Sequence, residues 1–329
     1  MEPVVTAHTQ ELWPRKALGA TGLMVPPLCI GTSELSGRTS IFPNPPGEQE
    51  ALATVRAILD GPIPFLDTAA GYGESERRIG VVLRERGGLP PGFVLSTKVD
   101  PDPQTRDYSG AQARRSVERS LTLLGLDHLQ LVYLHDPENT TFEQAMAPDG
   151  PVAALQQCRA EGLIAHIGVA GGPIDLLMRY VETGAFEVVL SHNRYTLLNV
   201  AAGPLWDLAG RRGLAAVNAA PYGGGILSKG PTASSKYAYR PASTDLLARA
   251  QRLEELCAQF QVPLAAAALQ FSMRDPRIAS TVVGIGRPER LAQTIALAQH
   301  PISDDFWSAA QAIRPDTEDL GQSDDRLGD

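Results

Sequence analysis

Residues 65–99 read FLDTAAGYGESERRIGVVLRERGGLPPGFVLSTKV and contain one complete strand–helix–strand unit. The short apolar runs 65–69 and 93–99 are typical of strands that are covered on both faces. Segment 75–86, between them, carries its apolar residues at helical spacing. The same alternation continues in both directions along the chain, so this unit indicates the architecture of the whole protein.

Eight such units are predicted. The expected strands are 28–32, 65–69, 93–99, 128–135, 164–170, 188–193, 215–219 and 279–283. The expected helices are 48–59, 75–86, 111–124, 152–160, 174–182, 201–211, 244–260 and 289–298. Strand then helix, repeated without a break in composition, predicts an α/β protein with a closed (β/α)8 TIM barrel. An open doubly wound sheet would need a G-x-G-x-x-G turn after its first strand, and none is present.

Further segments flank the predicted barrel. Residues 15–25, RKALGATGLMV, predict an N-terminal β-hairpin across the bottom of the barrel, and 303–313 predict an extra C-terminal helix capped by Ser303. We expect residues 1–314 to form a single barrel domain and residues 315–329 to be an acidic, disordered tail.

Long connections follow several of the predicted strands, at 33–47, 100–110, 136–150 and 220–243. In a barrel they share the C-terminal face, where active sites form, so we expect them to wall a substrate pocket. In the loops 33–47 and 220–243, hydroxyl-bearing and charged side chains outnumber large aliphatic side chains, which favours a small polar substrate. The side chains concerned are Ser33, Glu34, Arg38, Phe42, Asn44, Tyr222, Tyr237, Tyr239 and Arg240.

The composition of the 329 residues restricts the classes of function. With 43% hydrophobic and 20% charged residues, disorder of the whole chain is excluded. The net charge of −8 gives no attraction to nucleic acid or anionic lipid, so we expect a small-molecule substrate and neither of those partners. Three widely separated cysteines, no apolar signal region and no run of 18 apolar residues predict a cytoplasmic protein. The oligomeric state stays open.

Three consecutive predicted strands end in side chains that carry chemistry. Lys98, one of only four lysines, ends an apolar strand, and a buried ammonium needs a partner. Asp67 ends the preceding strand, and because neighbouring strands lie ~4.8 Å apart an ion pair between the two is natural. His135 ends the next strand, and Tyr72 lies on the loop that follows Asp67. These four side chains are therefore expected at one rim of the barrel.

These residues could form only a structural ion pair and a rim histidine, but their joint placement at matching strand ends favours a proton-transfer site. An adjacent ammonium would stabilise the phenolate of Tyr72 and make it a workable general acid and base. Asp67 would hold Lys98 in place and charged, and His135 would donate a hydrogen bond to a substrate oxygen.

Other chemistries receive less support from the sequence. Lys98 at a strand end could form a Schiff base in a lyase, and that alternative is kept. No histidine shows metal-ligand spacing, so no metal is expected. The run Gly223-Gly224-Gly225 could admit the phosphates of a ligand to backbone amides or be only a flexible loop.

At this point the sequence resembles the aldo-keto reductases. Phe-Leu-Asp67-Thr-Ala-x-x-Tyr72-Gly followed by Ser-Glu76-x-x-Ile-Gly80 is similar to the most specific signature of that family. Ser-Thr-Lys98 and Leu-x-His135 fall where its other catalytic residues lie, and the matches extend over residues 15–300. His-Asp-Pro at 135–137, Arg-Tyr-Thr-Leu-Leu at 194–198 and VPLAAAALQF at 262–271 resemble the branch of D-threo-aldose and L-fucose 1-dehydrogenases and pyridoxal 4-dehydrogenase.

This resemblance implies an enzyme that transfers hydride between NAD or NADP, laid across the barrel mouth, and a carbonyl or alcohol carbon. A cofactor-binding regulatory subunit with negligible turnover is kept as an alternative. The cofactor contacts that the resemblance implies are Gly31, Thr32, Asp67, His192, Tyr222, Gly224, Leu227, Gly284, Gly286, Arg290, Gln293 and Thr294.

Several positions depart from the pattern of the family. The carboxamide-holding Ser-Asn pair is replaced by Ala170-Gly171, a glutamine by His192, and the stacking tyrosine by Ala219. The two cations that grip the 2′-phosphate of NADP correspond here to Gly284 and Arg290. Because one cation is missing, NAD is expected to serve at least as well as NADP.

Overall fold

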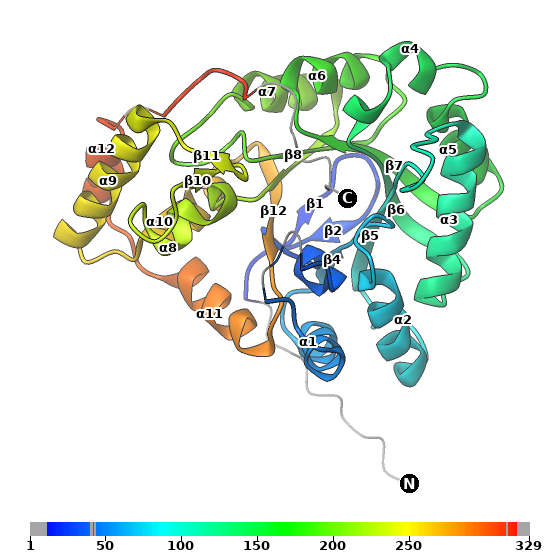
Figure 1. The fold of residues 1–329 in the computed structure, drawn as a ribbon, viewed down its shortest axis with the longest axis horizontal. Helices are drawn as coiled ribbons and strands as arrows, with labels where there is room; N and C mark the ends of the chain where they lie inside the picture. Colours follow the sequence, from blue (N-terminus) through cyan, green and yellow to red (C-terminus); the bar gives the residue numbers. More distant parts are fainter. Residues whose placement is uncertain (1–11, 40–41, 43, 314, 321–329) are drawn as a thin grey trace, which may run out of the picture.

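The computed structural model describes residues 12–39, 42, 44–313 and 315–320. Its centre is a closed barrel of parallel strands in the order β12-β3-β4-β5-β6-β7-β8-β9 (Figure 1). The strands are β3 (Leu28–Gly31), β4 (Phe65–Asp67), β5 (Val94–Val99), β6 (Leu129–His135), β7 (Ile164–Gly171), β8 (Val188–His192), β9 (Ala215–Ala219) and β12 (Ile278–Gly284). The predicted (β/α)8 barrel is confirmed.

A ring of helices surrounds these strands in Figure 1. Its members are α1 (Glu48–Asp60), α2 (Ser75–Arg86), α3 (Gly110–Leu124), α5 (Pro151–Ala160), α6 (Ile174–Glu182), α7 (Gly203–Arg212), α10 (Leu264–Met273) and α11 (Pro288–Gln299). Shorter elements interrupt the loops: η1 (Ser33–Ser36), η2 (Pro137–Asn139), α4 (Phe142–Ala145), η3 (Gly223–Gly225), α8 (Ile226–Lys229), β10 (Lys236–Tyr237) and β11 (Arg240–Pro241).

Alternation along each strand divides the core into two layers. One hydrophobic cluster fills the inside of the barrel and includes Phe65, Leu131 and Val217. A larger one lies between the strands and the helices and includes Leu66 and Val132, the residues next to Phe65 and Leu131 in sequence. Successive side chains of a strand point to opposite faces, so each strand is buried on both sides and its sequence is largely apolar instead of alternating between apolar and polar residues.

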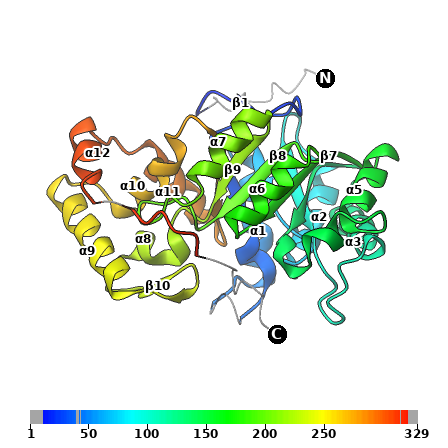
Figure 2. The ribbon, with the colours of Figure 1, turned by 90° about the horizontal axis from the view of Figure 1, so that it is seen from above.

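The predicted N-terminal hairpin is confirmed. β1 (Lys16–Ala17) pairs with β2 (Met24–Val25), and the turn between them passes close to the starts of the barrel strands. A Cβ on Gly19, which has a φ of +60°, would lie 2.8 Å from the backbone nitrogen of Ala215. The hairpin therefore closes the end of the barrel where the strands begin, opposite the β10–β11 ribbon (Figure 2).

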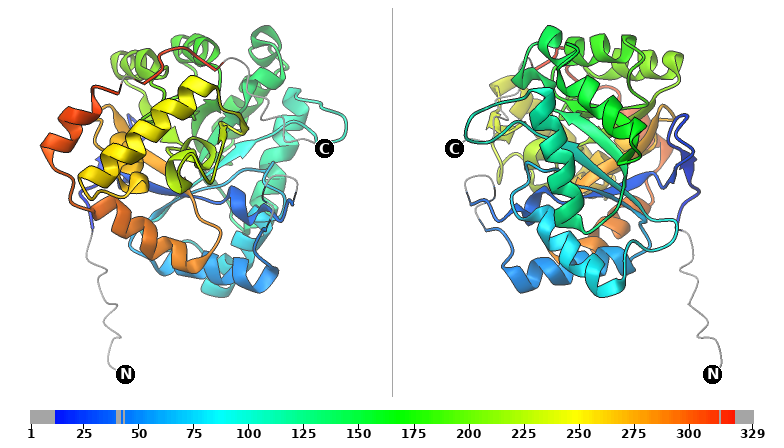
Figure 3. Two further views of the ribbon diagram at one scale, coloured as in Figure 1. Left: turned by 60° about the vertical axis from the view of Figure 1, so that its left-hand side comes forward. Right: turned by 90° about the vertical axis from the view of Figure 1, so that its right-hand side faces the viewer.

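The seventh helix of the ring differs from the prediction. α10 packs against β12, whereas α9 (Thr244–Gln259), the segment expected to fill this place, lies outside the ring beside α12 (Asp304–Ala310) (Figure 3). α10 is rich in alanine and buried on most sides, so its sequence lacks the apolar stripe that a surface helix shows. α9 is amphipathic and covers a separate apolar cluster with α12.

The C-terminal segment confirms one expectation and corrects another. The extra helix is α12, and the Ser303 side chain caps it by accepting a hydrogen bond from the Phe306 nitrogen. Residues 315–320, expected to begin a disordered tail, instead pack on the barrel, because Asp319 forms an ion pair of 2.9 Å with the buried Arg194. Residues 321–329 lie outside the described residues.

Among the residues that the structure describes, no single helix is both long and apolar enough to cross a membrane. The pair α9 and α10 passes that test together by length and composition, with a bend of 102° between its members.

The closeness of α2 and α3 leads to a stability prediction. A Cβ on Gly80 of α2 would lie 1.8 Å from the carbonyl oxygen of Leu123, whereas a Cβ on Gly210 of α7 meets nothing within 4 Å. We expect Gly80→Ala to lower the free energy of unfolding by about 3 kcal/mol through overpacking. The control Gly210→Ala should raise it by up to about 1 kcal/mol, because alanine favours the helix. Denaturant titration followed by circular dichroism measures both changes, and a Gly80→Ala protein as stable as wild type would contradict this packing.

Candidate active site

The carboxyl ends of β4, β5 and β6 bring three polar side chains to one rim. Asp67 is the last residue of β4, Lys98 lies near the end of β5, and His135 ends β6. The strands are neighbours in parallel register, with Asp67 beside Ser96 and Lys98 beside Tyr133. All three side chains are buried, so their polar groups must find partners inside the protein.

Lys98 is held by three oxygen atoms. Its Nζ lies 2.5 Å from Oδ2 of Asp67, 2.7 Å from the carbonyl oxygen of Thr68 and 3.4 Å from the hydroxyl of Tyr72. Burial alone would lower the pKa of Lys98, but the interactions with Asp67 and Tyr72 together outweigh burial and raise it. The side chain is therefore a charged ammonium at neutral pH, and Asp67 and Tyr72 meet through it.

Tyr72 reaches this ion pair from the loop after β4. Its ring lies beneath the Lys98 ammonium, with the nitrogen 4.8 Å from the ring centroid, and its centroid lies 5.7 Å from that of the His135 ring. Burial raises the pKa of Tyr72 above its ordinary value of 10.0, and the opposing effect of Lys98 is smaller. Lys98 does lower the pKa of this phenol, as expected, but burial has the larger effect, so the net shift is upward and the resting phenol is protonated.

His135 lies between two carboxylates. Its Nδ1 is 2.6 Å from Oδ1 of Asp100, and its Nε2 is 3.7 Å from Oδ2 of Asp136. Burial lowers the pKa of His135, but the two carboxylates outweigh burial and raise it to about 9. The imidazole therefore carries a positive charge at neutral pH. Asp100 also accepts a hydrogen bond from the Gly71 nitrogen through Oδ2, which ties the loop of Tyr72 to His135.

Most residues expected to contact the cofactor lie on the other half of the rim. They occupy the ends of β8, β9, β12 and β3, which are consecutive around the barrel. Gly31 and Gly284 are partners in register, and Gly286 follows two residues later. Arg290 and Gln293 are exposed on α11, and His192 ends β8 with its Nε2 3.8 Å from Oδ1 of Asp136. Tyr222 and Gly224 lie in the loop after β9.

Three of the expected contacts do not present a side chain to the rim. Thr32 is fully buried and its hydroxyl donates to the carbonyl oxygen of Asp67. Leu227 belongs to the apolar cluster under α9, and the Thr294 side chain is buried in α11. Tyr237, expected in the pocket wall, is also buried, and its hydroxyl lies 2.8 Å from that of Thr196.

The structure places three carboxylates at the rim to which the sequence assigned no role in proton transfer or cofactor binding; Glu34 was expected only in the pocket wall, and Asp136 only as part of a branch motif. Asp100 and Asp136 each follow a barrel strand and flank His135, and Glu34 lies in η1 against the end of β12. The sequence signal was their position directly after predicted strands.

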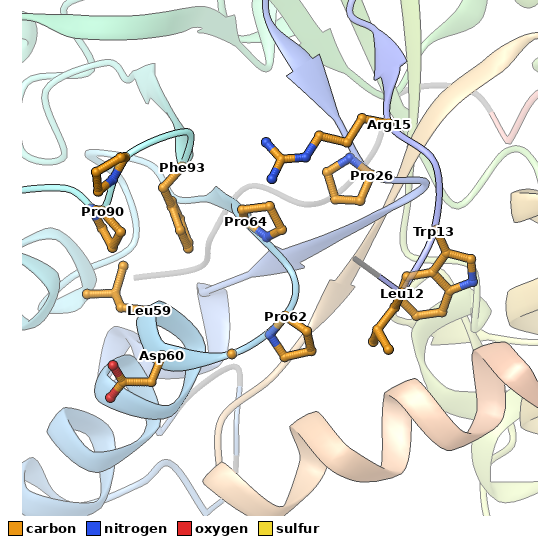
Figure 4. Close-up of a pocket in the computed structure, with 12 residues that line it drawn as sticks. Leu12, Trp13, Arg15, Pro26, Leu59, Asp60, Pro62, Pro64, Pro90 and Phe93 are labelled. Atoms are coloured by element: carbon orange, nitrogen blue, oxygen red, sulfur yellow. The ribbon is translucent and has the colours of Figure 1, made fainter. Parts of the chain in front are cut away.

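A second pocket, lined mainly by prolines and other apolar residues, lies at the opposite end of the barrel, where the strands begin. Figure 4 shows it lined by prolines that precede the strands, together with Trp13, Arg15 and Asp60. Asp60 is paired with Arg86, and Arg15 donates to the carbonyl oxygen of Gly92. Its charged groups are thus engaged in structural contacts, and the proton-transfer groups described above lie at the other end.

The barrel gathers an acid–lysine pair, a tyrosine and a histidine at the carboxyl end of its strands, and these groups form a site suited to proton transfer. The chain belongs to the aldo/keto reductase family, whose model matches residues 27–315. It is therefore an enzyme of the aldo-keto reductase type, an NAD(P)-dependent oxidoreductase.

Particular relatives agree with this assignment. The chain is 30% identical to a pyridoxal 4-dehydrogenase of Microbacterium luteolum, over 91% of this chain and 96% of that protein. It is 31% identical to a D-threo-aldose 1-dehydrogenase of a Pseudomonas species, over 91% and 97%. The solved holo form of an aldo-keto reductase from Bacillus halodurans superposes with a TM-score of 0.75 at 21% identity, over 94% of this chain and 99% of that one, and shows the shared fold.

The position of His135 between carboxylates leads to a prediction about its titration. We expect Asp100→Asn to move the pKa of His135 from about 9 down toward its ordinary value of 6.5, because one of the two flanking charges is removed. Proton NMR of the imidazole, assigned with His135→Asn, measures the shift. The exposed Asp127→Asn serves as a control.

The same shift makes stability depend on pH. Because the folded-state pKa of His135 lies above the unfolded value, its stabilisation is complete below pH ~6.5 and is lost as pH rises through about 9. The wild-type protein should lose stability across this window, and Asp100→Asn should show a smaller loss. An unchanged imidazole pKa in Asp100→Asn would show that Asp100 does not hold the charge on His135.

Proposed function

We propose that this enzyme transfers hydride between NAD or NADP and a carbonyl or alcohol carbon of a small polar substrate, an aldose sugar or a pyridoxal-like aldehyde. The observation that carries the proposal is the bridging position of the Lys98 ammonium between Asp67 and Tyr72. A buried cation in contact with a phenol is suited to moving a proton on and off that phenol.

The residues present on the β8–β9–β12–β3 half of the rim fit a dinucleotide. Gly31 and Gly284 lie side by side at the ends of β3 and β12, where the side chains of Val282 and Glu34 fill the space next to them. Gly224 is exposed in η3 and adopts a φ of +75°, a left-handed backbone conformation found in loops that bind anions. Arg290 and Tyr222 offer a cation and a ring for the adenosine half. When bound there, NAD(P) supplies or accepts the hydride.

Tyr72 is proposed as the proton donor in carbonyl reduction. Its raised pKa keeps the phenol protonated until a substrate oxygen gains negative charge, and it then gives its proton to that oxygen. The Lys98 ammonium, 3.4 Å from the hydroxyl, stabilises the phenolate that is left. In the oxidative direction the same phenolate takes the proton from the alcohol.

His135 and Asp67 support this proton transfer. The charged imidazole of His135 donates a hydrogen bond to the substrate oxygen, which stabilises the charge that develops there. Asp67 keeps Lys98 in place and charged. The same contact argues against the Schiff-base lyase, because an amine nucleophile needs a lowered pKa and that of Lys98 is raised.

The substrate class is proposed from the walls of the mouth and from the relatives. Arg38 and Tyr222 are half-buried and Asn44 is exposed in the loops after β3 and β9. The related proteins named above are a pyridoxal and an aldose dehydrogenase. NAD is proposed to serve at least as well as NADP, because Gly284 replaces one of the two cations that would grip the 2′-phosphate.

A mutational prediction tests the roles of Tyr72 and Lys98. We expect Tyr72→Phe and Lys98→Met each to lower kcat by ~10²- to 10⁴-fold, the usual contribution of general acid catalysis, with little change in cofactor Kd. Tyr180→Phe on α6 is the matched control, because its hydroxyl has no hydrogen-bond partner among the described residues. Steady-state kinetics with calorimetric cofactor titrations measures these effects. Near-normal turnover in both variants would refute the proposed roles.

A substrate screen tests the proposed reaction. We expect a change in absorbance at the nicotinamide band with aldoses or pyridoxal in at least one direction, and poor activity on steroids and long-chain ketones. Both directions and both cofactors are assayed. Strong preference for steroids would refute the substrate class. Turnover absent with every aldehyde, together with normal cofactor binding, would instead support a regulatory subunit.

A further inference from the structure

Glu34 covers the backbone of two glycines, Gly284 at the end of β12 and Gly286 just after it. It lies in η1, directly after β3, and reaches across to the end of β12. A Cβ on Gly284 would lie 3.1 Å from its Oε1, and a Cβ on Gly286 would lie 2.7 Å from its Oε2. A side chain at Gly286 would therefore collide with this carboxylate, and one at Gly284 would press against it.

The surroundings of Glu34 are cationic. Arg290, Lys229 and Arg287, from α11, α8 and the loop after β12, each act electrostatically on its carboxylate and oppose the rise in pKa that burial causes. Arg287 is engaged with Glu50, 2.6 Å away. Glu34 itself makes no hydrogen bond and no ion pair within 4 Å with the described part of the chain. It is thus a half-buried acceptor directed at the part of the rim proposed for the adenosine half of the cofactor.

We propose that Glu34 sets the cofactor preference: its carboxylate accepts a hydrogen bond from a ribose hydroxyl of the adenosine half of NAD and repels the phosphate that NADP carries there. This inference rests on the proposed dinucleotide site. It adds an acceptor and a repulsive charge to the missing cation at Gly284, so that selection against NADP does not depend on that absence alone.

Charge balance in this part of the rim supports the proposal. Arg287 is paired with Glu50, so without Glu34 the remaining cations Lys229 and Arg290 would give this part of the rim a positive charge suited to a dianionic phosphate. The carboxylate offsets part of that charge while leaving an acceptor for neutral hydroxyl donors. A ribose hydroxyl can donate a hydrogen bond to a carboxylate. A phosphate that is dianionic at neutral pH has only acceptors, and its negative charge repels the carboxylate.

Two variants separate the acceptor from the charge. Glu34→Gln keeps an acceptor oxygen and the shape of the side chain but removes the charge. We expect it to tighten NADP binding by about tenfold or more relative to NAD. Glu34→Ala removes both, so NADP binding should tighten and NAD binding should weaken. The exposed Glu289→Gln on α11 removes the same charge nearby and should leave the ratio of the two Kd values within about twofold.

Isothermal titration calorimetry of the full chain with NAD and with NADP measures these dissociation constants without reference to turnover. Circular dichroism checks that each variant is folded. A changed ratio in Glu34→Gln but not in Glu289→Gln supports the proposal. An unchanged ratio of the two Kd values in Glu34→Gln would overturn the proposal. If both cofactors bound more tightly by the same factor, Glu34 would act only as a general repulsive charge. If wild type binds neither dinucleotide, the proposed function fails together with this inference.

Discussion

The ion pair between Lys98 and Asp67 is the constraint on which the site depends. An ammonium buried at the end of a strand is costly unless its charge is matched and its protons are accepted. The barrel meets this requirement with the neighbouring strand end, with the carbonyl oxygen of Thr68 and with Tyr72. The loop after β4 is thereby fixed on the ammonium, and Asp100 fixes the same loop to His135. Two cations and the carboxylates that hold them thus organise one half of the rim.

Much of the fold follows from local patterns in the sequence. Strands covered on both faces are short and largely apolar, so all eight barrel strands were recognised. The regular alternation of these strands with helices then predicted a (β/α)8 barrel. The misplaced seventh helix shows the limit. α10 is buried on most sides by its neighbours, and its alanine-rich sequence gives no amphipathic stripe, whereas α9 has the stripe but uses it against α12. Packing between segments distant in sequence decides whether α9 or α10 enters the ring. The spacing of apolar residues within either helix therefore does not predict which one it is.

The site shows the same division. Asp67, Lys98 and His135 could be placed together because the carboxyl ends of neighbouring parallel strands lie at the same rim of the barrel. The roles of Asp100 and Glu34 could not, because a lone carboxylate in a loop is usually solvated and its burial here depends on long-range loop packing. The direction of the pKa shift of Tyr72 was missed for the same reason: the neighbouring cation is visible in the sequence, but the burial that outweighs it is not.

The apolar cluster shared by α9 and α12 is separate from the two clusters that form the core of the barrel. It includes Leu253 of α9 and Phe306 of α12, but also Ile226 and Leu227, which follow directly after the glycines of η3. Opening of α9 would remove support from the loop that borders the mouth. A ligand that binds only when this loop is ordered therefore also stabilises the packing of α9, because local opening of α9 would remove the loop conformation that binds it. Amide hydrogen exchange in α9, distant in sequence from every proton-transfer residue, then becomes a measure of occupancy at the mouth.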